Sequence, residues 1–314
     1  MSHRKRRALV SAPYMQPVLS RFTQFFADHD IEVVVPPVRE RLEEDELLAW
    51  IEDIDGVICG DDRFTERVLN KAKRLKVISK WGTGIDSIDQ ACCARLGIAV
   101  RNTPNAFTRP VADSVLGYIL CFARQIPWLH RIVASSEWSK LAGRALGECT
   151  LGIVGVGNIG RAVASRAAAF GMTLLGNDIR AIPEEVLAGT GMRAVDLETL
   201  LRESDFVSVN CDLNPTSFHL INAPRLALMR PQAVLVNTAR GPIVDEVALV
   251  EALEAGTIAG AALDVFEIEP LPLNSRLRSL PNVLLAAHAS NASPRAWEHV
   301  HDRTLANLVE ELDR

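Results

Sequence analysis

Three side chains in the second half of the sequence have the types and the order that proton transfer on a small acid requires: Arg240, Glu269 and His288. Each comes at or just after a short apolar run, where a parallel sheet would end its strands and bind its ligands. A guanidinium can hold a carboxylate through two hydrogen bonds and polarise the carbonyl beside it. An imidazole gives or takes a proton near neutral pH, and a nearby carboxylate stabilises its cation. The three together predict acid–base chemistry on a carboxylate-bearing substrate.

Each of these residues also has an ordinary structural explanation. An arginine after a strand is often a surface cation, and a glutamate before a proline is often a solvated turn residue. A histidine in an apolar run is often a satisfied core residue. Their placement after successive expected strands, downstream of a nucleotide-binding motif, favours the joint functional interpretation.

That motif lies in Leu151–Gly160, L-G-I-V-G-V-G-N-I-G, which contains G-x-G-x-x-G at Gly155, Gly157 and Gly160. An apolar run precedes it as a buried strand, and an alanine-rich helix over about 158–170 follows it. The first glycine suits a tight turn, the second lets a pyrophosphate approach the backbone, and the third lets helix and strand pack closely. The N–H groups at the start of the helix would bind the pyrophosphate.

The next expected strand runs into Asp178, which follows the third glycine by 18 residues. A carboxylate there accepts hydrogen bonds from the hydroxyls of the adenosine ribose and repels a 2′-phosphate. NAD is therefore favoured over NADP, and Arg180 nearby leaves some tolerance of NADP. An FAD site is disfavoured, because a complete α/β half precedes the motif.

Short apolar runs alternate with amphipathic stretches along the whole chain, which is the pattern of βαβ units and parallel sheets. Strands are expected at 7–10, 31–35, 56–59, 77–79 and 99–101, and in a second set at 151–155, 173–177, 206–210, 233–237, 260–264 and 283–286. Helices are expected within the first set at 17–29, 43–51, 66–72 and 90–96. The predicted fold class is α/β, with two doubly wound, Rossmann-like domains.

The turn-forming segment Asn102–Asn105 is a candidate hinge between the two halves. A long helix is expected over about Pro110–Arg124, with Thr108 as its cap and an interruption at Pro127 and Trp128. Its apolar positions lie on several faces that something must cover. Packing within the chain and a subunit interface explain them equally well.

The composition is that of a globular protein of 314 residues in about two domains. Lys and Arg number 34 and Asp and Glu number 39, so the formal net charge is −5. This mild acidity argues against nucleic acid as a partner, and no apolar run is long enough to cross a membrane. The six cysteines lack metal-ligand spacing and are interpreted as reduced residues of a cytoplasmic protein without a metal site.

These residues give the sequence a resemblance to the D-isomer-specific 2-hydroxyacid dehydrogenases, and among them to the 3-phosphoglycerate dehydrogenase-like branch. The resemblance covers most of the chain. Besides the glycine motif, Asp178 and His288, it rests on K-W-G-T-G-I-D-S-I-D at 80–89, N-T-P-N-A-F-T-R-P-V-A-D at 102–113, N-T-A-R-G-P-I-V-D at 237–245 and L-D-V-F-E-I-E-P-L at 263–271.

The resemblance implies a flavodoxin-like substrate domain at 1–103 plus 289–314, an NAD-binding Rossmann domain inserted at 104–288, and a homodimer joined through the NAD domain. It implies Arg240 as substrate anchor, His288 as acid or base, and Glu269 as the partner of His288. The residues expected to contact NAD are Gly155, Gly157, Asn158, Ile159, Gly160, Asp178, Asn210, Asp212, Thr238, Ala239 and Asp264.

The family's substrate loop falls on Thr83 and Gly84, whose backbone N–H groups would hold the substrate carboxylate. Two cations, Lys80 and Arg109, lie near the expected substrate site and favour a phosphorylated acid such as 3-phosphoglycerate. If they are solvated surface cations instead, the substrate is a small acid such as hydroxypyruvate or glyoxylate. The sequence supports both equally.

The expected activity is the NAD-dependent interconversion of a 2-keto acid and a D-2-hydroxy acid by hydride transfer. Two departures from the family stand out. The segment 210–214 reads N-C-D-L-N, so that an acid at Asp212 could alter the affinity for NAD. The segment 286–290 lacks a usual proline, which is expected to free the backbone around His288. A non-catalytic, NAD-sensing corepressor of the same fold is the alternative from another class, and steady turnover of a 2-keto acid would separate the two.

Overall fold

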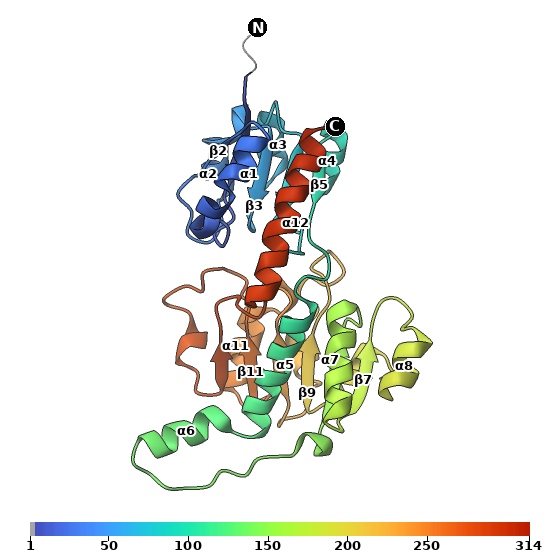
Figure 1. Ribbon diagram of the computed structural model, residues 1–314. Helices are drawn as coiled ribbons and strands as arrows, with labels where there is room; N and C mark the ends of the chain where they lie inside the picture. The colour runs from blue at the N-terminus through green and yellow to red at the C-terminus, as the bar shows by residue number, and fades with distance from the viewer. Residues whose placement is uncertain (1–3) are drawn as a thin grey trace. The chain divides into compact units, whose positions relative to one another are not determined.

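The computed structural model describes residues 4–314. The chain divides into two compact units, Met1–Phe107 with Ser293–Arg314 and Thr108–Ala292, and each carries its own parallel sheet (Figure 1). The division expected from the sequence, 1–103 with 289–314 and 104–288, cuts the chain four residues earlier at both crossings. Across the described residues, no helix is both long and apolar enough to cross a membrane.

The first unit is built on a five-stranded parallel sheet in the order β2-β1-β3-β4-β5. Its strands are β1 (Arg6–Val10), β2 (Ile31–Val34), β3 (Gly56–Cys59), β4 (Val77–Lys80) and β5 (Ala99–Arg101). Its helices are α1 (Thr23–Asp28), α2 (Glu44–Leu48), α3 (Glu66–Lys71), α4 (Gln90–Leu96) and α12 (Pro294–Leu312). The last helix of the chain, α12, packs on β3, β4 and β5, so this unit is completed by the C-terminal segment (Figure 1).

The second unit is built on a seven-stranded parallel sheet in the order β12-β11-β10-β9-β6-β7-β8. Its strands are β6 (Thr150–Val154), β7 (Thr173–Asn177), β8 (Arg193–Ala194), β9 (Phe206–Val209), β10 (Val234–Asn237), β11 (Gly260–Leu263) and β12 (Val283–Leu285). Its helices are α5 (Thr108–Ala123), α6 (Ile126–Ala134), α7 (Asn158–Ala169), α8 (Glu184–Thr190), α9 (Leu197–Glu203), α10 (Ala223–Leu226) and α11 (Glu246–Glu254). The strand order reverses between β6 and β9, and the carboxyl ends of strands at such a point are where doubly wound sheets bind ligands.

The central strands are buried along their whole length, as β3, β9, β10 and β11 illustrate. Strands of a parallel sheet covered by helices on both faces have this character, so they appear in the sequence as continuous apolar runs. For this reason the apolar runs predicted the strands well. Every expected strand is present, and the structure adds the short edge strand β8.

Two expected helices of the first unit differ from the structure. The segment expected as one helix over 17–29 is a 3-10 helix at Gln16–Phe22 followed by α1. The 3-10 helix buries none of its residues, so packing does not select one regular α-helix there. The segment expected as a helix over 43–51 is α2 followed by a 3-10 turn at Ile51–Asp53.

The boundaries of α5 and α6 also correct the sequence analysis. Thr108 is the first residue of α5 and not a cap outside it. After α5, Gln125 adopts a left-handed backbone with φ of 55°, and α6 begins at once. Pro127 lies in the first turn of α6, where a missing N–H has no cost. The proline therefore starts a new helix.

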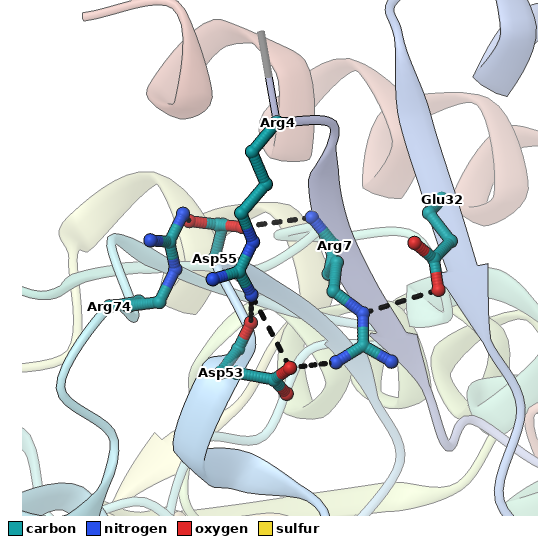
Figure 2. Close-up of polar contacts among 6 residues, drawn as sticks. All are labelled: Arg4, Arg7, Glu32, Asp53, Asp55 and Arg74. Atoms are coloured by element: carbon teal, nitrogen blue, oxygen red, sulfur yellow. Dashed lines mark hydrogen bonds and ion pairs between the residues drawn. The ribbon is translucent and has the colours of Figure 1, made fainter. Parts of the chain in front are cut away.

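A network of charged residues fixes the start of β1 (Figure 2). The buried Asp55 carboxylate accepts the backbone N–H of Arg7 at 2.9 Å and the guanidinium of Arg74 at 2.7 Å. The Arg7 guanidinium donates to Glu32 on β2 at 3.2 Å and also to Asp53. The network holds β1 between β2 and β3 at the edge where the strands begin, opposite the edge where a parallel sheet binds ligands.

Candidate active site

The three predicted catalytic side chains come from adjacent strands of the second unit. Arg240 follows β10, Glu269 follows β11 and His288 follows β12, and these strands are neighbours in the sheet. Because all the strands are parallel, their carboxyl ends lie at one edge of the sheet. Residues that follow successive strands in the sequence therefore lie at the same edge of the sheet.

Glu269 and His288 are in direct contact. The Nδ1 atom of His288 lies 3.0 Å from Oε2 of Glu269, and the two side chains are 21% and 16% exposed. The other oxygen of Glu269, Oε1, accepts the backbone N–H of Phe266 at 2.9 Å. The carboxylate is therefore held at both oxygens, and it fixes the plane and the orientation of the imidazole.

The backbone around His288 is held by Asp264, which is 1% exposed. The carbonyl oxygen of Asp264 accepts the N–H of His288 at 2.8 Å, and its carboxylate accepts those of Ala289 at 2.8 Å and Ser290 at 2.9 Å. His288 has a left-handed φ of 49°, which a non-glycine residue adopts only where its surroundings impose it. The lack of the usual proline therefore does not free the backbone here, because three hydrogen bonds to Asp264 hold the segment in place.

The turn that carries Arg240 is braced by Asn237, a residue that the sequence analysis did not single out. The buried amide of Asn237 donates to the carbonyl oxygen of Arg240 at 2.9 Å and accepts the N–H of Ala239 at 3.1 Å. A Cβ on Gly241 would lie 1.9 Å from the carbonyl carbon of Phe266. The Arg240 turn thus packs directly on the segment that leads into Glu269. The amide in N-T-A-R-G, at the end of an apolar run, was the signal that could have identified Asn237.

The glycine motif has the geometry of a pyrophosphate cradle. Gly155 has a φ of 89°, and a Cβ there would lie 2.6 Å from the backbone nitrogen of Cys211. A Cβ on Gly160 would lie 2.1 Å from the carbonyl oxygen of Gly155, so helix and strand pack with no room for a side chain. A Cβ on Gly157 would meet no atom within 4 Å, and α7 begins at the next residue, Asn158. The open space lies at the helix N-terminus, where an anion is stabilised.

Asp178, directly after β7, is tied to the same turn. Its carboxylate accepts the N–H of Val156 at 2.8 Å and that of Arg180 at 2.9 Å, one at each oxygen. A carboxylate oxygen has two acceptor sites, so each oxygen keeps capacity for a ribose hydroxyl. The guanidinium of Arg180 is 81% exposed and lies 3.9 Å from Asp178. The motif and Asp178 therefore fit a dinucleotide with two unmodified ribose hydroxyls.

The remaining predicted cofactor residues lie after β9 and β10. The side chain of Asn210 turns back to Ser208, and Asp212 is exposed. Thr238 is buried, and its Oγ1 has no hydrogen-bond partner among the described residues. A buried hydroxyl without a partner is unfavourable unless a ligand satisfies it, which fits the expected nicotinamide end of the site. Of the two remaining predicted residues, Ile159 lies in α7 and Ala239 lies in the turn that carries Arg240.

The predicted substrate residues belong to different units. Thr83 and Gly84 lie in the loop after β4, where Thr83 Oγ1 donates to the carbonyl oxygen of Thr103 at 3.0 Å. Lys80 ends β4, is only 4% exposed and lies 3.0 Å from Asp61. Arg109 is exposed in the first turn of α5, in the second unit. Lys80 is therefore not a solvated surface cation, and its charge is compensated within the protein.

Comparisons with known proteins agree with this architecture. The model of the D-isomer specific 2-hydroxyacid dehydrogenase NAD-binding domain matches residues 116–290. A glyoxylate reductase of Thermofilum pendens is 41% identical, over 87% of this chain and 81% of that protein. A D-3-phosphoglycerate dehydrogenase of Methanocaldococcus jannaschii is 39% identical, over 84% of this chain and 51% of that protein.

The solved structures agree as well. The structure of a D-lactate dehydrogenase from Aquifex aeolicus, in complex with NAD and lactic acid, has a TM-score of 0.84 at 26% identity. The match covers 96% of this chain and 93% of the D-lactate dehydrogenase. The cofactor expected from the glycine motif and Asp178 is confirmed as NAD, and the chain is an oxidoreductase that belongs to the D-isomer specific 2-hydroxyacid dehydrogenases.

Proposed function

We propose that Arg240, Glu269 and His288 are the catalytic residues of a reductase acting on a small 2-keto acid. The contact of His288 Nδ1 with Glu269 Oε2 at 3.0 Å carries this proposal, because Phe266 fixes the other oxygen of the same carboxylate. The contact sets the tautomer in which Nδ1 carries a hydrogen, so that Nε2 exchanges the proton with the substrate oxygen. When bound, the nicotinamide cofactor would donate a hydride to C2 of the keto acid as NADH, or accept it from the hydroxy acid as NAD.

Arg240 would hold the substrate carboxylate and polarise the adjacent carbonyl. In the first unit, the backbone N–H groups of Thr83 and Gly84 remain the proposed carboxylate-binding loop. Asp178 would accept from the ribose hydroxyls and disfavour the 2′-phosphate of NADP. Gly157 would let the pyrophosphate approach the N-terminus of α7.

We propose an unphosphorylated substrate of the glyoxylate or hydroxypyruvate class. Lys80, the side chain that could have bound a phosphate, is buried and paired with Asp61. Moving Lys80 toward a phosphate would break its ion pair with Asp61 at 3.0 Å. Arg109 is left as an exposed cation, which gives little binding energy by itself. The relative named glyoxylate reductase supports the same substrate class, and the relative named D-3-phosphoglycerate dehydrogenase supports the alternative.

We also propose a homodimer that uses the segment from α6 to about residue 145. Four large apolar side chains are exposed on it: Ile126 at 52%, Val133 at 53%, Trp138 at 90% and Leu141 at 38%. Apolar side chains gathered on one segment are typical of a subunit interface. A monomer at micromolar concentration in analytical ultracentrifugation would contradict this proposal.

Loss of NADH absorbance, followed with glyoxylate, hydroxypyruvate and 3-phosphohydroxypyruvate in turn, tests the function. Higher kcat/KM for the two unphosphorylated acids is expected. Preference for the phosphorylated acid would overturn the substrate class, and absence of turnover with every 2-keto acid would overturn the reductase and favour a binding protein.

A further inference from the structure

A second cluster of ionisable side chains lies in the segments that carry the proposed catalytic residues. His219 belongs to the loop between β9 and α10, and its Nε2 lies 2.9 Å from Oε1 of Glu267. Its Nδ1 lies 3.9 Å from Oδ2 of Asp245. Glu267 Oε1 also accepts the N–H of Glu246 at 3.1 Å, and the N–H of Glu267 donates to Glu246 Oε2 at 3.2 Å. One imidazole therefore stands among three carboxylates.

The donor atoms of His219, Asp245 and Glu267 lie within 4.8 Å of one another, so a metal ion has to be considered. The imidazole, however, turns one nitrogen toward Glu267 and the other toward Asp245. A single ion could use only one of these two nitrogens. Nε2 is at hydrogen-bond distance from Glu267, while Nδ1 faces Asp245 at 3.9 Å, beyond that distance. The oxygen of Glu267 that faces the ring also accepts a backbone N–H. This arrangement is that of a hydrogen-bonded ionic network.

The network is joined to the catalytic pair through one short segment. Glu267 follows Phe266, whose N–H binds Oε1 of Glu269, and Oε2 of Glu269 contacts His288. The peptide between Phe266 and Glu267 is also the surface on which Gly241, next to Arg240, packs. A residue that fixes Glu267 therefore also fixes Phe266, whose N–H holds the Glu269 carboxylate.

His219 is itself anchored to the Arg240 turn. Its N–H donates to the carbonyl oxygen of Pro242 at 2.9 Å, and the N–H of Ile221 donates to that of Ile243 at 3.0 Å. His219 has a left-handed φ of 47°, and the ring of Phe218 stacks on its imidazole with centroids 4.1 Å apart. A non-glycine residue keeps this backbone only where the surroundings impose it.

We propose that His219 is a positioning residue for the reaction: by binding Glu267 it fixes the turn from Phe266 to Glu269, so that Glu269 meets His288 in the orientation that proton transfer requires. This inference rests on the proposed roles of Glu269 and His288. Burial and the charge of Glu267 raise the pKa of Glu246, which reflects the crowding of negative charge there.

Steady-state kinetics of His219→Ala, His219→Gln and Glu267→Gln test the proposal, with His299→Ala on an exposed face of α12 as the control. We expect His219→Ala to lower kcat about 10- to 100-fold with little change in the KM for NADH, because the catalytic pair loses its support while the cofactor site is untouched. His219→Gln keeps one donor toward Glu267 and should recover part of the loss. Glu267→Gln keeps an uncharged acceptor oxygen for the imidazole, so its loss of kcat should be smaller than that of His219→Ala. His299→Ala should match the wild type.

A merely structural role would lower the melting temperature and the yield of folded protein, while kcat per folded molecule stayed the same. Full kcat in folded His219→Ala would therefore overturn the proposal. If that variant does not fold, full kcat in His219→Gln together with full kcat in Glu267→Gln would overturn it.

The downfield proton signal of His288 Nδ1–H, assigned by its loss in His288→Gln, gives a test that does not need turnover. Exchange of this proton with water should be at least ~10-fold faster in His219→Ala, because the bond to Glu269 opens more often. Unchanged exchange would overturn the role of His219. If the wild type turns over no 2-keto acid but this proton still exchanges faster in His219→Ala, the result counts against the proposed function and not against the role of His219.

Discussion

The carboxylate of Asp264 accepts the two backbone N–H groups that follow His288, and its carbonyl oxygen accepts that of His288 itself. One buried acid therefore holds the backbone segment that carries the His288 imidazole.

The same acid affects a neighbouring side chain. Burial raises the pKa of Tyr118 to about 12, and the negative charge of Asp264 adds to this effect.

Asp264→Asn should destabilise the protein and slow turnover. The amide replaces one acceptor oxygen with a donor that faces a backbone N–H, and such a buried mismatch costs about 1–3 kcal/mol. Urea unfolding gives the free energy of unfolding, and kcat with glyoxylate gives the catalytic loss. Wild-type values of both would contradict the assignment of Asp264 as the support of His288.

His288→Ala should lower turnover by at least ~10²-fold, because the proton of the substrate oxygen loses its donor and acceptor. The affinity for NADH, measured by fluorescence titration, should fall only modestly. Unchanged turnover would remove His288 from the mechanism.

Gly157→Ala should fold normally and bind NADH more weakly. A Cβ on Gly157 meets no protein atom within 4 Å, so the added methyl group would occupy space that the pyrophosphate needs. Gly189→Ala on α8 is the matched control, because a Cβ there also meets nothing within 4 Å. Equal NADH affinity in the two variants would place the pyrophosphate elsewhere.

Lys80→Met should lower stability without changing which acid is preferred. The substitution leaves Asp61 without the cation 3.0 Å away. Thermal unfolding should move to lower temperature, and the ratio of kcat/KM for hydroxypyruvate and 3-phosphohydroxypyruvate should stay as in the wild type. A selective loss of activity on the phosphorylated acid would instead assign Lys80 to a phosphate site.

The buried Asp62 should make stability depend on pH. Burial raises its pKa to about 6 in the folded protein, whereas an unfolded aspartate titrates near ~3.9. Between these values the folded state holds a proton that the unfolded state has released, so this contribution to stability falls as the pH rises from about 4 to about 6. Because asparagine does not titrate, the unfolding free energy of the wild type should fall relative to that of Asp62→Asn as the pH rises across this range. Parallel pH profiles would contradict the shift.

The sequence by itself determined the strands, the glycine motif and the order of Arg240, Glu269 and His288. Strand burial appears as continuous apolar runs. The constraint on Gly160 is local, since a Cβ there would meet the carbonyl oxygen of Gly155, whereas the close approach of Gly155 to the backbone of Cys211 is a tertiary contact. Parallel strands then bring their carboxyl ends to one edge, so residues that follow successive strands become neighbours.

Only the tertiary structure decided how these residues are supported. Asp264 and Ser290 are far apart in sequence, as are His219 and Glu267, and Lys80 at the end of β4 is paired with Asp61 in the loop after β3. No periodicity marks such pairs, because a hydrogen bond or an ion pair depends on how side chains pack and how deeply they are buried. The same reason explains why the burial of Lys80 and its ion pair with Asp61 could not be predicted from the sequence.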